Sequence, residues 1–406
     1  MNLGYFISKR ISSGRQDGFS STTHKIAVVS IAIGLSAAIV SFLIMKGFQQ
    51  TIKNKIYSFS SHLLITKFTI DNSLEEQPFF YNINFYKDYK KYGYIDHVQE
   101  YCHKAGLIKT DDEVFGIVFK GVGKSFGLEN FKRNLIEGRF LHWPDSGYAN
   151  EVVISRHIAS KVNAQVEDDL IVHFFQNPPR FRRLKVVGIY ETNLSEYFDN
   201  KMIIGDIRLI QRLNDWADSV AGGLEVFVKD VDKVDEAFLT IGEDMDYDLY
   251  IEKVSDKYVQ VFEWLGLITR QVNILLGVIL IVVCVNMISV VLILVMERTQ
   301  MIGTLKALGA GNQLIRSVFV YSGIKLIASG LFFGNLVGLG LCYIQYQYRI
   351  VPLNAHDYYM DFVPIGWDWT AVLMLNILIF LLVTLVLFLP TALVSRINPI
   401  RAIRFD

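Results

Sequence analysis

The stretch of this chain that comes nearest to a phosphate-binding motif is GVGKS, Gly121 to Ser125. A P-loop has another glycine five positions before its Gly-Lys-Ser triplet, so that backbone N–H groups can surround the phosphates. Here that position is Val118. The stretch therefore predicts a surface turn and not a nucleotide site.

A group of acidic residues resembles the start of a calcium-binding loop. Asp244, Asp246 and Asp248 have the right spacing, but the sixth and twelfth positions, which require Gly and Glu, are Leu249 and Ser255. A solvated acidic turn is the better interpretation.

His97, Cys102 and His103 offer metal ligands, but no second pair stands at zinc spacing. The sequence also lacks the hydrolase patterns H-E-x-x-H and G-x-S-x-G. We therefore expect no metal, no catalytic residues and no cofactor bound by this chain.

The elements that must position any site are dominated by four apolar runs without a charged residue: 26–45, 271–296, 326–348 and 369–395. A helix rises 1.5 Å per residue, so about 20 residues cross a hydrocarbon core of about 30 Å. We predict four transmembrane helices, at residues 26–47, 269–296, 317–348 and 369–395. The first is expected to remain as an anchor, because no signal-peptide cleavage site follows it.

Lysine and arginine near the helix ends predict the orientation. The segments 1–25, 297–316 and 396–406 together hold 10 basic and 3 acidic residues. By the positive-inside rule they are cytoplasmic, so both termini lie inside. A domain at 48–268 and a short loop at 349–368 then lie outside.

The formal net charge over 406 residues is zero, but acidic and basic residues are concentrated in different parts of the chain. Residues 48–268 contain 26 basic and 34 acidic residues, and the remainder contains 14 and 6. The cytoplasmic excess suits anionic lipid headgroups, so membrane lipid is an expected partner and nucleic acid is not. With 51% apolar residues and three cysteines, the chain is neither disordered nor a disulfide scaffold.

The large outer domain has mixed α+β character. Strands are predicted at 152–154, 184–190 and 223–228, and residues 231–241 have helical spacing. The expected fold class is a polytopic α-helical membrane protein with four transmembrane helices. The large α+β extracytoplasmic domain is inserted between helices 1 and 2.

Small residues recur at intervals of four in two of the predicted membrane helices. In lipid, such positions let another backbone approach closely. We expect helix-packing faces at two sets of positions: Ser30, Gly34 and Ala38, and Gly330, Gly334 and Gly338.

The cytoplasmic loop 297–316 has a helical pattern of its own. Ile302, Leu305 and Leu308 are spaced along one helix face, and Gly309 is a natural end to that helix. Such a helix either fits a partner's groove or lies on lipid, and the spacing does not separate these interpretations.

This loop resembles the coupling helix of FtsX-like ABC transporter permeases. The matching residues are Glu297, Arg298, Ile302, Gly303, Leu305, Lys306, Ala307, Leu308, Gly309 and Ala310. The tail from Ser395 to Arg404 and the one-plus-three helix layout are also similar to that family. Motifs at 137–139, 151–155 and 186–191 resemble its lipoprotein-releasing members, of LolC/LolE type.

The resemblance implies a non-catalytic subunit of a Gram-negative inner-membrane transporter. A cytoplasmic ATPase, which binds ATP and Mg²⁺, would seat on the loop from Glu297 to Ala310. The complex would contain a second permease, either a copy or a paralogue. It would extract lipid-anchored proteins from the inner membrane and pass them to a periplasmic carrier.

The resemblance also indicates a carrier-contact hairpin, at Phe174 to Arg183. Its candidate residues are Asn177, Pro178, Pro179, Arg180 and Arg182. The hairpin is shorter than the family's recruiting version, and an ordinary hairpin turn is the alternative. Alternatives for the whole chain are an FtsX-like mechanotransmitter that controls a cell-wall partner, a MacB-like efflux permease, or a membrane-anchored sensor.

Overall fold

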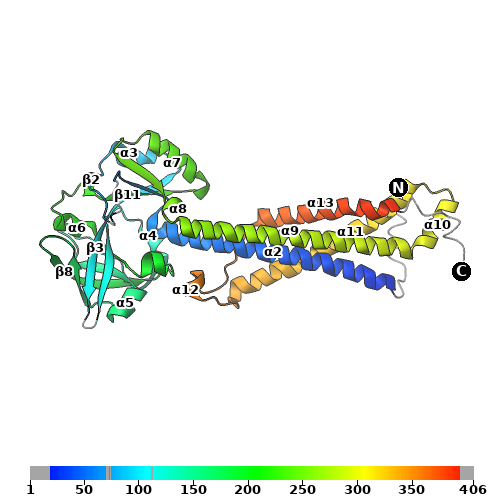
Figure 1. Ribbon diagram of the computed structural model, residues 1–406, viewed down its shortest axis with the longest axis horizontal. Coiled ribbons are helices and arrows are strands. Elements are labelled where there is room, and N and C mark those ends of the chain that lie inside the picture. Colours follow the sequence, from blue (N-terminus) through cyan, green and yellow to red (C-terminus); the bar gives the residue numbers. More distant parts are fainter. Residues whose placement is uncertain (1–18, 70–72, 74, 111–112, 394–406) are drawn as a thin grey trace. The chain divides into compact units, whose positions relative to one another are not determined.

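The computed structural model describes residues 19–69, 73, 75–110 and 113–393 (Figure 1). They form two compact units. The first, called the membrane unit, holds the described residues up to Gln50, Trp264–Pro352 and those from Phe362 onward. The second, called the outer unit, holds Thr51–Glu263 and Leu353–Asp361. The predicted tail 396–406 and residues 1–18 of the predicted N-terminal segment lie outside the described residues.

The predicted fold class is confirmed. Four helices among the described residues are long and apolar enough to cross a membrane, and the α+β domain is inserted between the first and the second. A helix satisfies its backbone N–H and C=O groups within its own segment, as hydrocarbon requires. These helices are α2 (Phe19–Ser60), α9 (Val259–Glu297), α11 (Asn312–Tyr348) and α13 (Trp369–Leu393), and the short α10 (Thr299–Ala307) stands between α9 and α11.

The apolar core of the membrane unit is built around one face of α2. Every fourth residue from Ala27 to Leu43 is at most 2% exposed. Residues of the other three long helices complete the cluster, among them Met287, Ile327 and Ile379. In Figure 1, α9 runs beside α2 over a long stretch. Helix α2 therefore contributes one continuous buried face to this core, and α13 packs against α11, where Asn335 and Asn376 exchange hydrogen bonds.

The glycines of α11 allow a close approach to α2. Cβ atoms added at Gly330, Gly334 and Gly338 would lie 2.6 to 3.0 Å from atoms of Ile31, Leu35 and Ser36. Those distances are too short for an unshifted neighbour, so the two backbones meet where no side chain intervenes.

The small residues of α2 face a different helix. A Cβ atom at Gly34 would lie 2.3 Å from Cγ2 of Val283 in α9. One turn earlier, Asn286 Nδ2 of α9 donates a hydrogen bond to Ser30 Oγ at 2.8 Å. Ala38 is 2% exposed. The two sets of small residues thus serve two packing faces, α2 with α11 and α2 with α9.

The outer unit contains a ten-stranded sheet in the order β12-β1-β11-β3-β4-β9-β6-β8-β5, with β7 paired to β3 and β8. The strands of this sheet and the separate β2–β10 pair are β1 Leu63–Lys67, β2 Phe79–Phe80, β3 Ile95–Lys109, β4 Val114–Val122, β5 Leu135–Gly138, β6 Glu151–Ser155, β7 Asp169–Phe174, β8 Arg180–Tyr190, β9 Met202–Asp206, β10 Val220–Ala221, β11 Gly223–Val228 and β12 Leu249–Lys253. The short α-helices are α3 Asn84–Asp88, α4 Leu128–Phe131, α5 Arg156–Val162, α6 Ile207–Leu213, α7 Val234–Glu243, α8 Val254–Lys257 and α12 Ala355–Tyr358. The predicted strands at 152–154, 184–190 and 223–228 are confirmed as β6, β8 and β11.

The long strand β3 connects two apolar cores. Its first half pairs with β11, next to a cluster that includes Leu224 and Ala237. Its last residues pair with β7, in a cluster that includes Phe119 and Val186. The helix predicted at 231–241 begins as an α-helix only at Val234, because the Asp230 side chain accepts from Asp232 N and holds the preceding turn as a 3₁₀-helix.

The GVGKS stretch ends strand β4 and turns beside an acidic side chain. A Cβ atom at Gly123 would collide with the Glu100 carboxylate, which also accepts a hydrogen bond from the Ser125 hydroxyl. A carboxylate at this position repels phosphate, which argues against a nucleotide site. The predicted surface turn is correct only for Lys124 and Ser125, because Gly121, Val122 and Gly123 are buried and the first two belong to β4. In the part of the chain that the structure describes, no three His, Cys, Asp or Glu side chains group as metal ligands.

We predict that Gly334→Val loosens the membrane unit, because the new side chain must push α11 away from Leu35. Overpacking of this kind costs about 1–3 kcal/mol. The melting temperature of the detergent-solubilised chain should fall. Gly340→Val is the matched control in the same helix, where an added Cβ meets nothing within 4 Å. Equal melting temperatures for the two variants would contradict this account of the packing.

Candidate functional site

The candidate coupling site is the segment that joins α9 to α11. Helix α10 ends at Ala307, and Gly309 follows with φ +89°, where an L side chain would be strained. Ala310 N donates to Leu305 O and Gly309 N to Lys306 O, the hydrogen-bond pattern of a Schellman cap. The end of the helix is therefore fixed in shape, as the sequence indicated for Gly309.

The apolar face of α10 packs against the chain itself. Ile302 is 0% exposed, Gly303 is buried, and Leu305 packs against the membrane-unit core. The sequence left open whether this stripe fits a partner's groove or lies on lipid, and in the structure its first two members, Ile302 and Leu305, pack against the chain's own helices. The reason is geometric: Ile302 and Leu305 share the helix face that is turned toward the bundle. Leu308 lies beyond the helix end and is 85% exposed.

Only some of the predicted coupling residues are exposed. Glu297, Ala307, Leu308 and Gly309 are exposed, whereas Arg298, Lys306 and Ala310 are partly buried. We call the exposed four the coupling surface. It is the part of the predicted coupling residues that a partner can touch without unpacking α10.

The candidate carrier site is the hairpin of β7 and β8, in which Phe174 pairs with Arg180. The connecting residues Asn177, Pro178 and Pro179 are exposed. Arg180 is turned toward its own domain, because its guanidinium donates to Leu213 O at 3.2 Å and lies 3.8 Å from the Asp215 carboxylate. The guanidinium of Arg182 donates to Phe181 O at 2.9 Å. The arginines are therefore partly engaged by the chain itself.

Exposed apolar side chains on this hairpin were not among the residues predicted from the sequence. Ile171, Phe175 and Phe181 are 41%, 56% and 63% exposed. The sequence could have indicated this exposure, because all of residues 170–175 except His173 are apolar. In a strand, apolar residues at consecutive positions point to both faces of the sheet, so one set is not turned toward the core. Exposed apolar side chains that gather on one hairpin are typical of a docking surface.

A buried ion pair fastens the end of α2 to the sheet. Lys120 Nζ of β4 donates to Glu225 Oε1 of β11 and to Phe59 O of α2, each at 2.6 Å. The two side chains are 3% and 2% exposed, and Gln99 Nε2 donates to the second Glu225 oxygen at 2.6 Å. Removing one member would leave a buried charge, which costs about 3–5 kcal/mol. No local sequence pattern marks this pair, whose members are 105 residues apart.

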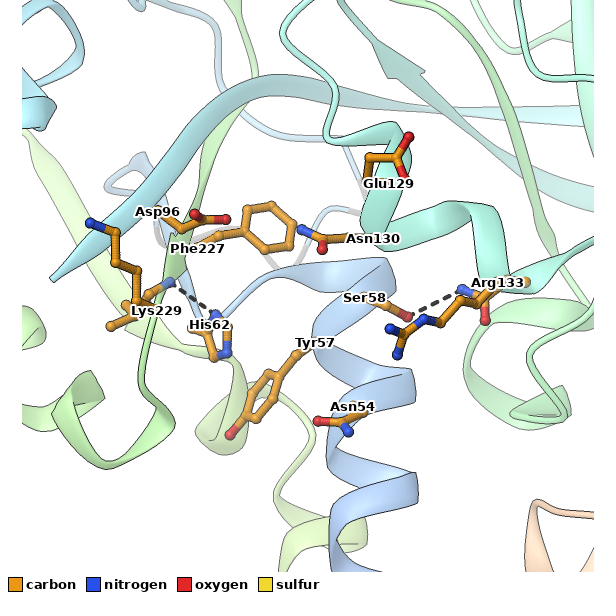
Figure 2. Close-up of a pocket in the computed structure, with 12 residues that line it drawn as sticks. Asn54, Tyr57, Ser58, His62, Asp96, Glu129, Asn130, Arg133, Phe227 and Lys229 are labelled. Carbon is orange, nitrogen blue, oxygen red and sulfur yellow. Dashed lines mark hydrogen bonds between the residues drawn. The ribbon is translucent and has the colours of Figure 1, made fainter.

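A polar groove of about 480 Å³ lies next to this fastening point (Figure 2). Acidic Asp96 and Glu129 and basic Arg133 and Lys229 line it, together with Asn54, Asn130 and His62. The fixed charges balance, and the lining offers no nucleophile paired with a base. The groove can therefore bind a polar ligand, but its residues do not form a catalytic constellation.

His62 is held neutral in the wall of this groove. Val228 N donates to its Nδ1 at 3.1 Å, and its ring packs at a tilt of 33° against the Tyr57 ring, with centroids 4.3 Å apart. Burial lowers the pKa of His62 from 6.5 to about 4. The protonated form is thus excluded at neutral pH.

Both parts of the chain match known permease families. Residues 26–238 match the MacB-like periplasmic core domain, and residues 273–399 match the FtsX-like permease C-terminal family. The lipoprotein-releasing system transmembrane protein LolC of Buchnera aphidicola subsp. Schizaphis graminum is 22% identical, over 87% of this chain and 86% of that protein. The corresponding LolE of Haemophilus influenzae is 21% identical, over 98% of both chains. The crystal structure of the periplasmic region of MacB from Actinobacillus actinomycetemcomitans is 15% identical, over 50% of this chain and 92% of that one, with a TM-score of 0.33.

We predict that acid destabilises the outer unit through His62. Its pKa is about 4 when folded and about 6.5 when unfolded, so only the unfolded state binds the proton between these values. Stability is therefore complete above pH 6.5 and is lost as the pH falls toward 4, by about 3 kcal/mol in total.

The measurement is the fall in melting temperature between about pH 7 and about pH 5, a range in which histidine titrates. His62→Asn keeps a hydrogen-bond acceptor but does not titrate, so its melting temperature should fall less than that of the wild type. His173→Asn, at an exposed histidine of β7, is the control and should behave like the wild type. An unchanged fall in His62→Asn would refute this role.

Proposed function

Since this chain belongs to the FtsX-like permeases that carry a MacB-like periplasmic core domain, we propose that it releases lipoproteins from the bacterial inner membrane as a subunit of an ATP-driven transporter. The observation that carries the proposal is likeness over nearly the whole chain: the two lipoprotein-releasing relatives match 87% and 98% of it. Fold alone would not support a function. Here the membrane helices, the outer domain and the coupling segment are matched together.

The proposed topology follows from charge. Residues 48–268 form the periplasmic domain, and both termini and the loop 297–316 lie in the cytoplasm, where their basic excess faces anionic headgroups. The chain itself is proposed to be non-catalytic. A separate cytoplasmic ATPase would bind ATP and Mg²⁺ and contact the coupling surface around Leu308.

ATP is needed because extraction is uphill. Removing an acyl chain from the bilayer costs about 0.8 kcal/mol for each CH₂ group exposed. A second permease, either another copy of this chain or a paralogue, is proposed to complete the complex. The released lipoprotein would pass to a periplasmic carrier.

The outward face of the β7–β8 hairpin is the proposed carrier contact. Its support is the exposure of Ile171, Phe175 and Phe181, which would bury apolar area against a partner. The rigid tip at Asn177 to Pro179 would set the direction of approach. Arg180 is not assigned a carrier contact, because its guanidinium is bound to its own domain.

The proposal is tested by purifying the tagged chain after gentle solubilisation. An ATPase and lipid-modified proteins should purify with it, and depletion of the chain should leave lipoproteins in the inner membrane. An ATPase without lipoproteins, together with chained cells on depletion, would instead support the mechanotransmitter alternative. Repeated recovery of the chain alone would refute both.

We predict that Leu308→Asp detaches the ATPase without unfolding the chain. A charge at an exposed apolar contact typically costs about 2 kcal/mol or more of binding free energy, or roughly 30-fold in affinity. The control is Leu239→Asp, at a leucine of α7 that is 65% exposed. Co-purified ATPase is the readout, and retention of full ATPase by Leu308→Asp would exclude Leu308 from the contact.

We predict that Phe175→Ser combined with Phe181→Ser weakens transfer to the carrier about tenfold or more, while ATP hydrolysis is unchanged. Loss of apolar contact area is the physical reason. Leu239→Ser is the exposed control on the same domain. Transfer at the wild-type rate would remove the hairpin from the carrier contact.

A further inference from the structure

The connection between α11 and α13 is a closed hairpin. Leu353 N donates to Asp361 O at 2.8 Å, Pro352 and Phe362 form a β-bridge, and Val363 N donates to Val351 O at 3.2 Å. These contacts tie the outgoing and returning chains together at the base of the segment. A force applied at the tip of the hairpin would therefore act on both α11 and α13.

The base of this hairpin is fastened to α11. The side chain of Gln345, which is 9% exposed, accepts from Val351 N at 3.0 Å and donates to Val363 O at 3.0 Å. One amide thus holds both chains of the hairpin. Arg349 adds a contact with the Phe362 ring, 4.2 Å from its centroid.

The tip of the hairpin is fastened to α2 within the outer unit. Lys55 Nζ donates to Tyr359 O at 2.8 Å. Asn193 Nδ2 donates to Asp361 Oδ2 at 3.4 Å. Met360, next to the bonded carbonyl, is 3% exposed. The tip is therefore held by hydrogen bonds and burial together.

A single rigid element joins this hairpin to the coupling site. Helix α11 begins at Asn312, immediately after the coupling surface, and its 37 residues span about 55 Å. Its other end carries Gln345. One continuous hydrogen-bonded helix therefore connects the coupling site with the base of the hairpin.

We propose that the α11–α13 connection, residues 349–363, is a strut that passes movement of α11 and α13 to the outer unit, and that Lys55 is the positioning residue that holds it. The inference rests on the proposed function for the source of the movement, an ATPase at the coupling surface. It assigns a mechanical role to a lysine and a loop that contact neither ATPase nor cargo.

The experiment measures an ATP-dependent change in the distance between two spin labels and does not depend on release of a lipoprotein. Spin labels at Tyr247→Cys of the outer unit and Tyr348→Cys at the end of α11, both exposed, are placed in a chain with Cys284→Ser. The labelled chain is assembled with its ATPase in nanodiscs, and distances are measured with and without ATP. Lys55→Met should reduce the ATP-dependent distance change by about half or more, while ATP hydrolysis stays within about twofold of the wild type.

Control variants distinguish loss of the Lys55 contact from a general loss of structure. Lys55→Arg keeps a cationic donor and should restore the distance change, and Lys53→Met, two residues earlier, should behave like the wild type. If Lys55→Met does not assemble, Gln345→Leu at the other end of the strut replaces it, with the same expected loss. Where both assemble, the double variant should lose no more than either single variant.

A full distance change in Lys55→Met or in Gln345→Leu overturns the strut, and so does the absence of any ATP-dependent change in the wild type. A wild-type complex that moves with ATP but releases no lipoprotein overturns the proposed function alone. The two failures are therefore distinguishable.

Discussion

In hydrocarbon, every backbone N–H and C=O must find its partner within its own segment. This constraint makes each membrane crossing a continuous helix, and the helices of this chain run beyond the length that a bilayer requires. Such helices are rods. A rod carries displacement from one end to the other, so a cytoplasmic event and a periplasmic event can share one element.

A helix transmits movement to another element only where the two are held in close contact. Between α2 and α11 the fastening is close backbone contact at Gly330, Gly334 and Gly338. At the end of α2 it is a buried ion pair that binds Phe59 O to two strands. The proposed strut adds another fastening, between α2 and the α11–α13 hairpin. In the proposed transporter, movement would pass between elements at these contacts.

Features encoded by local sequence were predictable. Charge-free runs identified the membrane helices, short segments rich in β-branched and other apolar residues identified β6, β8 and β11, and Gly309 marked the end of α10. Features that depend on distant residues were not. The pairing of Lys120 with Glu225, the turning of Arg180 toward Asp215, and the different partners of the two small-residue sets are set by tertiary packing. The spacing of Ile302 and Leu305 predicted an apolar face correctly but did not say that the chain's own helices cover it.

In the proposed function, ATP hydrolysis at the cytoplasmic surface drives release of a lipid-anchored protein at the periplasmic surface. The most direct test reconstitutes the chain with its ATPase and partner permease in liposomes that carry a fluorescent acylated lipoprotein, with the carrier outside. We expect transfer of the lipoprotein to the carrier with ATP, and none with a non-hydrolysable analogue. Steady ATP hydrolysis with the lipoprotein retained in the bilayer would contradict it.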